Sequence, residues 1–204
     1  MTPTLEMMPL QTVTPASFRR FTVSEYHRLT EAGYLTPEDR VELLEGILVT
    51  KMARNPPHEA GINQLMFALI AVVGPDWNVR IQNAIQLGTS EPEPDAAVVR
   101  MRANRYADRH PEAADIGLLV EVSDSSLARD RIDKLRIYAR AGVPTYWIVN
   151  LIDRQIEVYD RPTGPSANPE YASRQTYTAG DSIPVILGGV TLGQIAVSAV
   201  LPAA

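Results

Sequence analysis

The sequence predicts an α/β protein in which helices flank a mixed β-sheet. Segments with apolar residues at spacings of three and four alternate along the chain with short, continuous apolar runs, which are typical of helices and central strands respectively. The 204 residues are 45% hydrophobic and 21% charged, an ordinary globular composition. No internal repeat or change of composition divides the chain, so residues 21–204 are expected to form one domain.

The first half of the chain predicts two helices and a strand pair. Residues 1–20 lack periodicity and are expected to be a mobile tail. Thr22 and Glu25 form a capping box that starts a short helix ending at Gly33. RVELLEGILVTKM, residues 40–52, predicts two strands joined by a tight turn. Residues 58–74 carry apolar side chains at helical spacing and predict a second helix.

The second half predicts strands separated by one helix. Strands are expected at 78–88, 94–100, 116–122, 144–150 and 155–160, and a helix at 129–142. Residues 161–170 have the composition of a loop, and 172–189 predict one or two further strands ending in a turn.

The bulk composition excludes several classes of protein. The chain has no cysteine, so disulfides, thiolate metal sites and cysteine nucleophiles are ruled out. No apolar run is long enough to span a bilayer and the N-terminus lacks a targeting pattern, so we expect a soluble cytoplasmic protein without a membrane partner. The net charge of −5 argues against a surface that attracts polyanions everywhere, but it leaves local basic patches open.

Charged residues inside apolar segments indicate a site. Asp95 stands at the entrance of one apolar strand and Glu121 in the middle of another, where a charge is costly unless it is paired or binds a cation. Glu45 and Lys134 also fall in apolar surroundings. If the strands are neighbours, these groups converge into a site suited to Mg²⁺ or Mn²⁺, which promote phosphodiester hydrolysis.

Simpler interpretations of these residues stay open. Asp95 after Pro94 could merely begin a strand, and Glu45 before Gly46 is a common turn pair. Lys134 could face solvent and pair with Asp130. The three histidines, His27, His58 and His110, are too far apart in sequence to make a local ligand motif, and His58 suits a helix N-terminus.

The chain resembles a known family in four segments, EPEPDAAVV, LLVEVSDSS, RDRIDKLRIYARAGVPTYWIVN and QIEVYD. These are similar to the Uma-two family of endonucleases, a branch of the PD-(D/E)XK, or restriction-endonuclease-like, superfamily, and the likeness runs over about residues 21–197. It implies a restriction-endonuclease-like mixed central sheet flanked by helices, with additional C-terminal strands. It also implies that Asp95 and Glu121 are metal ligands and that Glu45 completes the metal site or orients water.

The resemblance assigns further roles by position. Ser123 stands where the superfamily more often has lysine, and the resemblance implies that Lys134, one turn after Asp130, supplies the ammonium. Gln82 and His58 match polar positions for which the resemblance implies secondary roles at most.

Two functional hypotheses follow. The first is a metal-dependent endonuclease that hydrolyses phosphodiester bonds of nucleic acid, with DNA as the expected substrate, Mg²⁺ or Mn²⁺ as cofactor and a homodimer as the expected assembly. The alternative is a nuclease-like fold that acts as a non-catalytic nucleic-acid-binding or scaffolding module, which the net charge and Ser123 motivate. A small-molecule phosphodiesterase or a toxin-like RNase is a third, weaker alternative.

Overall fold

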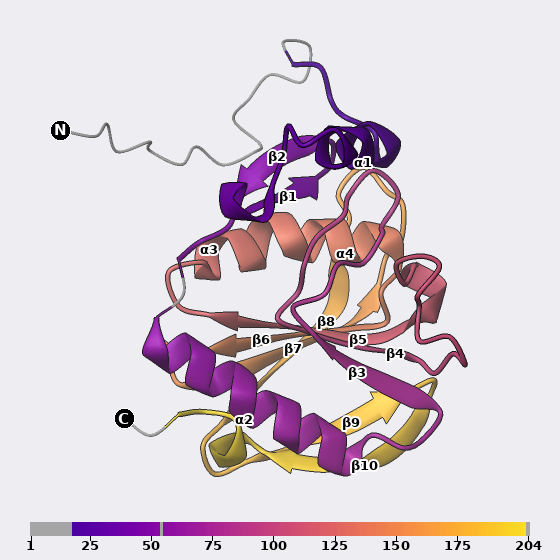
Figure 1. The fold of residues 1–204 in the computed structure, drawn as a ribbon. Helices are drawn as coiled ribbons and strands as arrows, with labels where there is room; N and C mark the ends of the chain where they lie inside the picture. The colour runs from indigo at the N-terminus through magenta and orange to yellow at the C-terminus, as the bar shows by residue number, and fades with distance from the viewer. Residues whose placement is uncertain (1–17, 54, 203–204) are drawn as a thin grey trace, which may run out of the picture.

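A six-stranded mixed sheet forms the centre of the protein in a computed structural model that describes residues 18–53 and 55–202 (Figure 1). Most of the expected tail, residues 1–17, lies outside these ranges. The strand order is β3-β4-β5-β6-β7-β8, and only the β5–β6 pair is parallel. The strands are β3 (Trp77–Ile81), β4 (Ala96–Arg100), β5 (Ile116–Ser123), β6 (Thr145–Asn150), β7 (Gln155–Pro162) and β8 (Tyr171–Thr178).

A helical crossover joins the parallel strands β5 and β6. A parallel pair needs such a crossover because the chain must return to the end of the sheet where the first strand began, which a tight turn cannot do. The crossover runs through α3 (Leu127–Arg129), a π-helical turn (Asp130–Lys134) and α4 (Leu135–Ala141), and it ends at Gly142, whose φ is 76°. The sequence predicted this helix over 129–142 but not its π-helical turn.

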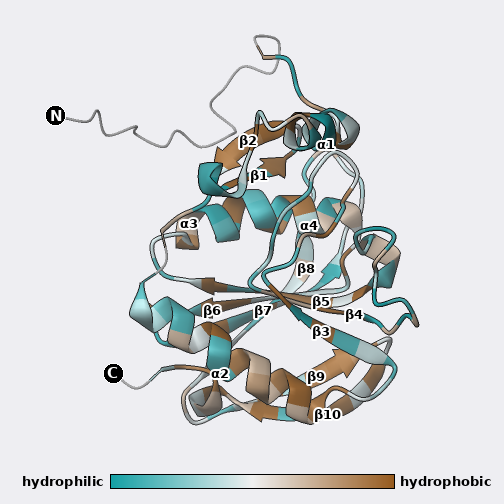
Figure 2. Ribbon diagram, viewed as in Figure 1, coloured by the Kyte–Doolittle hydropathy of each residue, from teal (hydrophilic) through white to brown (hydrophobic). Residues whose placement is uncertain are grey.

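The helix α4 covers one face of the sheet (Figure 1). The other face is covered by α2 (Pro56–Val72) and by the hairpin of β9 (Ser182–Leu187) and β10 (Val190–Ala196). Side chains from β9 and β10 join those of the sheet and α2 in one hydrophobic cluster, and a second cluster lies between the sheet and α4. Figure 2 shows hydrophobic colouring on much of β9 and β10, which agrees with this packing. The strands β4 to β7 therefore have apolar residues on both faces, whereas the apolar residues of β3 all join the cluster with α2 and the hairpin.

The N-terminal elements lie over α4 (Figure 1). The capping box of Thr22 and Glu25 starts α1 (Val23–Glu31), as predicted. The strands β1 (Val41–Leu44) and β2 (Ile47–Thr50) form the expected antiparallel hairpin. Glu45 and Gly46 make its turn with φ values of 48° and 79°. Short 3₁₀ helices cover Pro37–Asp39, Ala113–Asp115 and Val197–Ala199.

The predicted fold class, a mixed sheet flanked by helices with additional C-terminal strands, is confirmed. The one or two strands predicted over 172–189 are β8 and β9, but β10 beyond them was not predicted, and the strand predicted over 78–88 ends at Ile81. The strand β10 begins directly after Gly188-Gly189 and itself contains Gly193, so its composition suggests a turn more than a strand. Across residues 18–53 and 55–202, no helix is long and apolar enough to cross a membrane.

Candidate active site

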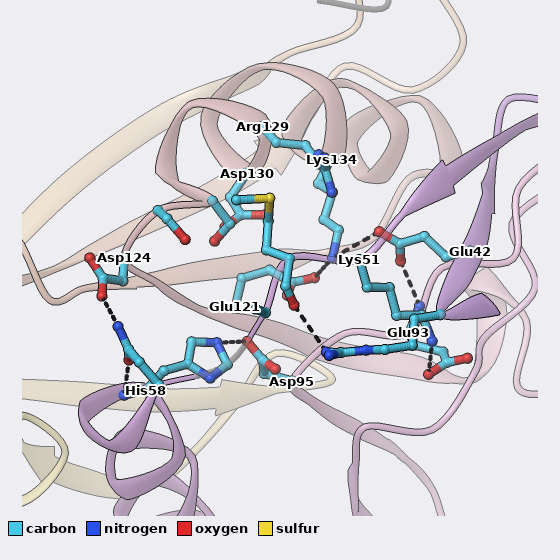
Figure 3. Close-up of a pocket in the computed structure, with 16 residues that line it drawn as sticks. Glu42, Lys51, His58, Glu93, Asp95, Glu121, Asp124, Arg129, Asp130 and Lys134 are labelled. Carbon is cyan, nitrogen blue, oxygen red and sulfur yellow. Dashed lines mark hydrogen bonds and ion pairs between the residues drawn. The ribbon is translucent and has the colours of Figure 1, made fainter. Parts of the chain in front are cut away.

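The register of β4 against β5 brings Asp95 opposite Glu121. Ala96 pairs with Val120 in this antiparallel ladder, so the residue before Ala96 faces the residue after Val120. Directly opposed residues point to the same side of a sheet. That side faces α4, and Asp95 and Glu121 are only 9% and 3% exposed. Two carboxylates far apart in sequence thus share one buried location (Figure 3).

Three groups fix the carboxylate of Asp95. Its Oδ2 accepts a hydrogen bond of 2.9 Å from the amide of Val122 and lies 3.3 Å from His58 Nε2. Its Oδ1 accepts a hydrogen bond of 3.3 Å from Gln82 Nε2. Burial would raise the pKa of Asp95, but His58, Lys134 and the Val122 amide outweigh burial and hold the pKa below its ordinary value. Asp95 is therefore held as an ionised carboxylate.

The backbone at Gln82 supports this arrangement. Gln82 has a φ of 53°, in the left-handed region that non-glycine residues rarely adopt, and its amide donates to the carbonyl of Asp95 at 3.1 Å. Such strained positions cluster at functional sites. Gln82 and His58, which the resemblance gave secondary roles at most, both lie against Asp95.

The ammonium of Lys134 connects two carboxylates. Its Nζ donates to Glu121 Oε1 at 2.8 Å and lies 3.7 Å from Glu42 Oε1 (Figure 3). The hydroxyl of Tyr138 also donates to Glu121 Oε1 at 2.8 Å. Lys134 is buried, which by itself would lower its pKa, but Glu121, Glu42 and Asp130 raise the pKa and keep the side chain charged. The alternative of a solvent-facing lysine does not hold, because Lys134 is 6% exposed.

Asp130 is held by hydroxyl groups and not by a direct ion pair with the lysine. Its Oδ2 accepts hydrogen bonds of 2.7 Å from Ser123 Oγ and from Ser126 Oγ. Ser123 is fully buried at the end of β5, so the hydroxyl anchors the crossover helix to the sheet. Lys134, one turn further along the helix, contacts Glu121. Ser123 occupies the position on β5 at which the superfamily more often has lysine.

Glu45 does not join this cluster, contrary to the sequence prediction. Its carboxylate accepts hydrogen bonds from Arg136 at 2.6 and 2.7 Å and from Arg140 at 2.6 Å. Burial would raise the pKa of Glu45, but these arginines hold it below its ordinary value. The left-handed turn at Glu45 directs its side chain to α4, and the hairpin instead places Glu42 of β1 beside Lys134.

Glu42 is the site residue that the sequence reasoning missed. It lies between Val41 and Leu43 in β1, it is 2% exposed, and its Oε2 accepts a hydrogen bond of 3.1 Å from the amide of Glu93. A carboxylate inside an apolar strand is the signal that singled out Glu121, and it applied equally to Glu42. The prediction selected Glu45, three residues further along the chain, instead of Glu42.

A pocket opens onto these carboxylates, and basic side chains form part of its wall. Its lining includes Asp95, Glu121, Glu42 and Lys134, together with the basic residues Arg40, Lys51 and Arg129. Lys51 forms an ion pair with Glu93, and Arg129 donates to the carbonyl of Thr50 at 3.0 Å. The pocket therefore has carboxylates at its bottom and cationic side chains in its wall, and an anionic ligand could bind to those cationic side chains.

The fold that carries this cluster, a mixed sheet flanked by helices, is of the restriction-endonuclease-like class. The chain is similar to a crystal structure described as "a putative nuclease belonging to DUF820 from Anabaena variabilis", with a TM-score of 0.67 and 15% identity over 89% of this chain and 97% of that chain. Residues 23–197 match the Uma2 family, described as "Putative restriction endonuclease". The chain belongs to the Uma2 family. No curated protein matches the sequence.

Proposed function

We propose that the protein is a divalent-metal-dependent endonuclease that hydrolyses phosphodiester bonds of DNA. The observation that carries the proposal is the placement of Asp95 opposite Glu121, with the Lys134 ammonium 2.8 Å from Glu121, at a pocket of mixed charge. Membership of a family described as restriction endonucleases supports DNA as the substrate. Asp95 and Glu121 are the proposed ligands of Mg²⁺ or Mn²⁺, and Glu42 takes the place predicted for Glu45.

The charges in the pocket fit a hard cation. Its buried charged residues are the carboxylates Glu42, Asp95, Glu121 and Asp130 against the ammonium of Lys134. Burial raises the pKa of Glu121 well above its ordinary value, Asp130 and Asp95 raise it further, and Lys134 only partly offsets them. This surplus of negative charge is what a dication with oxygen ligands would neutralise. When bound, the cation would stabilise negative charge on the phosphate and lower the pKa of bound water.

The residues of the chain have distinct roles in this proposal. His58 and the Val122 amide hold Asp95 in its ionised form. Lys134 stays protonated beside Glu121 and can donate to a phosphate oxygen or position the attacking water. Arg40, Lys51 and Arg129 line the pocket and provide local contacts for the phosphodiester backbone despite the net charge of −5.

A homodimer remains part of the proposal, because cutting both strands of a duplex takes two active sites or two binding events. Size-exclusion chromatography with light scattering on the full chain tests this assembly. A dimer mass supports it, and a monomer at assay concentrations contradicts it.

The test of the proposed activity is cleavage of supercoiled and single-stranded DNA with Mg²⁺, with Mn²⁺ and with chelator. We expect metal-dependent cleavage that falls about a hundredfold or more in Asp95→Asn, Glu121→Gln and Glu42→Gln, since metal ligands contribute several kcal/mol to transition-state stabilisation. Glu45→Gln is the matched control, because Glu45 contacts Arg136 and Arg140 outside the pocket, and it should cleave like the wild type. Cleavage that survives Asp95→Asn would contradict the assignment.

The alternative of a non-catalytic nucleic-acid-binding module is supported by Ser123 at the strand position where the superfamily more often has lysine. It predicts DNA binding by the wild type without cleavage under any divalent metal. The same assay, run with fluorescence anisotropy of labelled DNA, separates this alternative from the enzyme.

A further inference from the structure

Two of the three histidines meet at a buried glutamate outside the active-site pocket. His27 lies on α1, Glu91 precedes β4, and His110 lies on the loop between β4 and β5. His27 Nε2 is 2.7 Å from Glu91 Oε2, and His110 Nε2 is 3.8 Å from Glu91 Oε1. The three ligand atoms all lie within 4.8 Å of one another. None of these residues lines the pocket of Asp95 and Glu121.

The local structure fixes the backbone at or beside each of the three residues. The amide of Glu91 donates to the carbonyl of Leu43 at 2.7 Å, which ties its backbone to β1. His27 lies in a helix whose start is fixed by its capping box. On either side of His110, Arg109 pairs with Asp115 at 2.6 Å and the carbonyl of Pro111 accepts from Gln86 at 2.8 Å. The cluster is therefore built by three anchored segments.

The donor set suits a borderline transition-metal dication. Two imidazoles and a carboxylate are ligands that Zn²⁺ accepts, and ligand atoms about 2.0–2.1 Å from a tetrahedral Zn²⁺ lie roughly 3.3 Å apart. The imidazole nitrogens of His27 and His110 lie 2.7 and 3.8 Å from the two oxygens of Glu91, on either side of that value. The side chains of His27 and His110 are 41% and 39% exposed, so water can reach the remaining coordination positions.

The charge balance of Glu91 points the same way. Its carboxylate is buried, and within residues 18–53 and 55–202 its ion-pair partners are the two imidazoles. Neither partner is a lysine or an arginine, the residues that usually accompany a buried carboxylate. A dication bound between the three side chains would compensate the carboxylate fully.

We infer that His27, Glu91 and His110 form a second metal site, which binds a Zn²⁺-class dication and fastens α1 and the loop before β5 to the segment that leads into β4. The site uses imidazole donors, whereas the proposed nuclease centre uses carboxylates for Mg²⁺ or Mn²⁺. The inference does not depend on the nuclease proposal, since the two sites share no residue.

The test is titration of the metal-stripped full chain with Zn²⁺ by calorimetry, and with Co²⁺ by visible absorption. We expect one equivalent of Zn²⁺ at this site in the wild type, separate from metal bound at the proposed nuclease centre, together with the d–d bands of a low-coordinate Co²⁺ site and a higher Tm with Zn²⁺. His27→Gln and His110→Gln should each weaken Zn²⁺ binding by about tenfold or more, because one ligand is lost. The matched control is His58→Gln, which changes the remaining histidine and should keep the Zn²⁺ affinity.

Each outcome bears on the second site. Zn²⁺ binding that is lost in His58→Gln but kept in His27→Gln would place the metal at the Asp95 pocket and overturn the inference, as would no binding to the wild type. Nuclear magnetic resonance of the wild-type imidazoles avoids any dependence on folded variants. Zn²⁺ should shift the signals of two histidines, assigned as His27 and His110, and a shift confined to His58 would also overturn the inference.

Discussion

The ammonium group of Lys134 lies beside Glu121 of β5, although Lys134 itself belongs to the crossover helix. It comes from the crossover helix, contacts Glu121 at 2.8 Å and is nearly inaccessible to solvent. The strand position where a lysine is more often found holds Ser123, whose hydroxyl bonds Asp130. Burial raises the pKa of Glu121 well above its ordinary value and the ammonium of Lys134 opposes part of that rise, so Lys134 is coupled to the charge state of the cluster.

Replacing Lys134 separates catalysis from binding. In Lys134→Met we expect cleavage to fall about a hundredfold or more, because the donor to the phosphate is removed, while DNA affinity changes only a few-fold because the basic residues of the pocket wall remain. Lys134→Arg keeps the charge and should retain part of the activity. Plasmid cleavage and anisotropy titrations measure the two quantities, and undiminished cleavage by the methionine variant would refute the role.

At the scale of elements, β5 carries the site and is held by close contacts to its neighbours. Gly117 lies at the start of β5, where an added Cβ would come within 2.6 Å of Trp77 and 3.0 Å of Leu187. Those two side chains belong to β3 and β9. The glycine therefore lets the edge of the sheet and the C-terminal hairpin close over the strand that bears Glu121.

Gly117→Ala tests this packing. We expect the free energy of unfolding to fall by about 1–3 kcal/mol, since a methyl group must displace ring atoms of Trp77. The matched control is Gly180→Ala, at a turn where an added Cβ meets nothing within 4 Å, and it should change stability by less than about 0.5 kcal/mol. Urea denaturation followed by circular dichroism gives both values. Equal stability of the two variants would show that the contact is not tight.

At the scale of the whole molecule, Glu157 links the crossover helix to three strands. Its carboxylate is fully buried on β7 and accepts hydrogen bonds from Arg131 at 3.1 Å, from Asn150 at 3.1 Å and from Tyr159 at 2.5 Å. Arg174 of β8 lies 3.1 Å away. Burial would raise the pKa of Glu157, but Arg131, Tyr159 and Asn150 lower it from 4.5 to about 2.

This lowered pKa predicts an acid-sensitive part of the stability. The folded protein keeps Glu157 ionised below the pH at which the unfolded chain takes up a proton, so its stabilisation is complete above pH 4.5 and is lost as the pH falls towards 2. A change of that size is worth about 3 kcal/mol at neutral pH. Glu157→Gln should therefore be less stable by about that amount at pH 7 and by only about 1 kcal/mol at pH 3.

Urea denaturation of both proteins between pH 7 and pH 3 measures the difference. Glu170→Gln, a change at an exposed glutamate, is the control and should follow the wild type closely. A difference between Glu157→Gln and the wild type that stays constant with pH would contradict the role of the buried carboxylate.

Local patterns in the sequence were enough to predict most elements and to single out two carboxylates of the candidate site. The capping box of α1, the apolar period of α2 and the continuous apolar runs of β4, β5 and β6 each reflect neighbours a few residues away, which any stretch of sequence reveals. Asp95 and Glu121 stood out for the same reason, because a carboxylate among apolar neighbours is visible locally. The strand β10 and the π-helical turn were missed because their sequences carry no such local pattern.

The remaining decisions depend on contacts between distant residues. Whether Glu42 or Glu45 reaches Lys134 is set by the turn of the β1–β2 hairpin and by two arginines of α4, which bind Glu45 from 91 and 95 residues away. His27 and His110 are unremarkable in sequence and meet at Glu91 only through the packing of α1 and a loop. Periodicity reports which face of an element is buried, but only the tertiary fold determines which side chains of separate elements share that buried space.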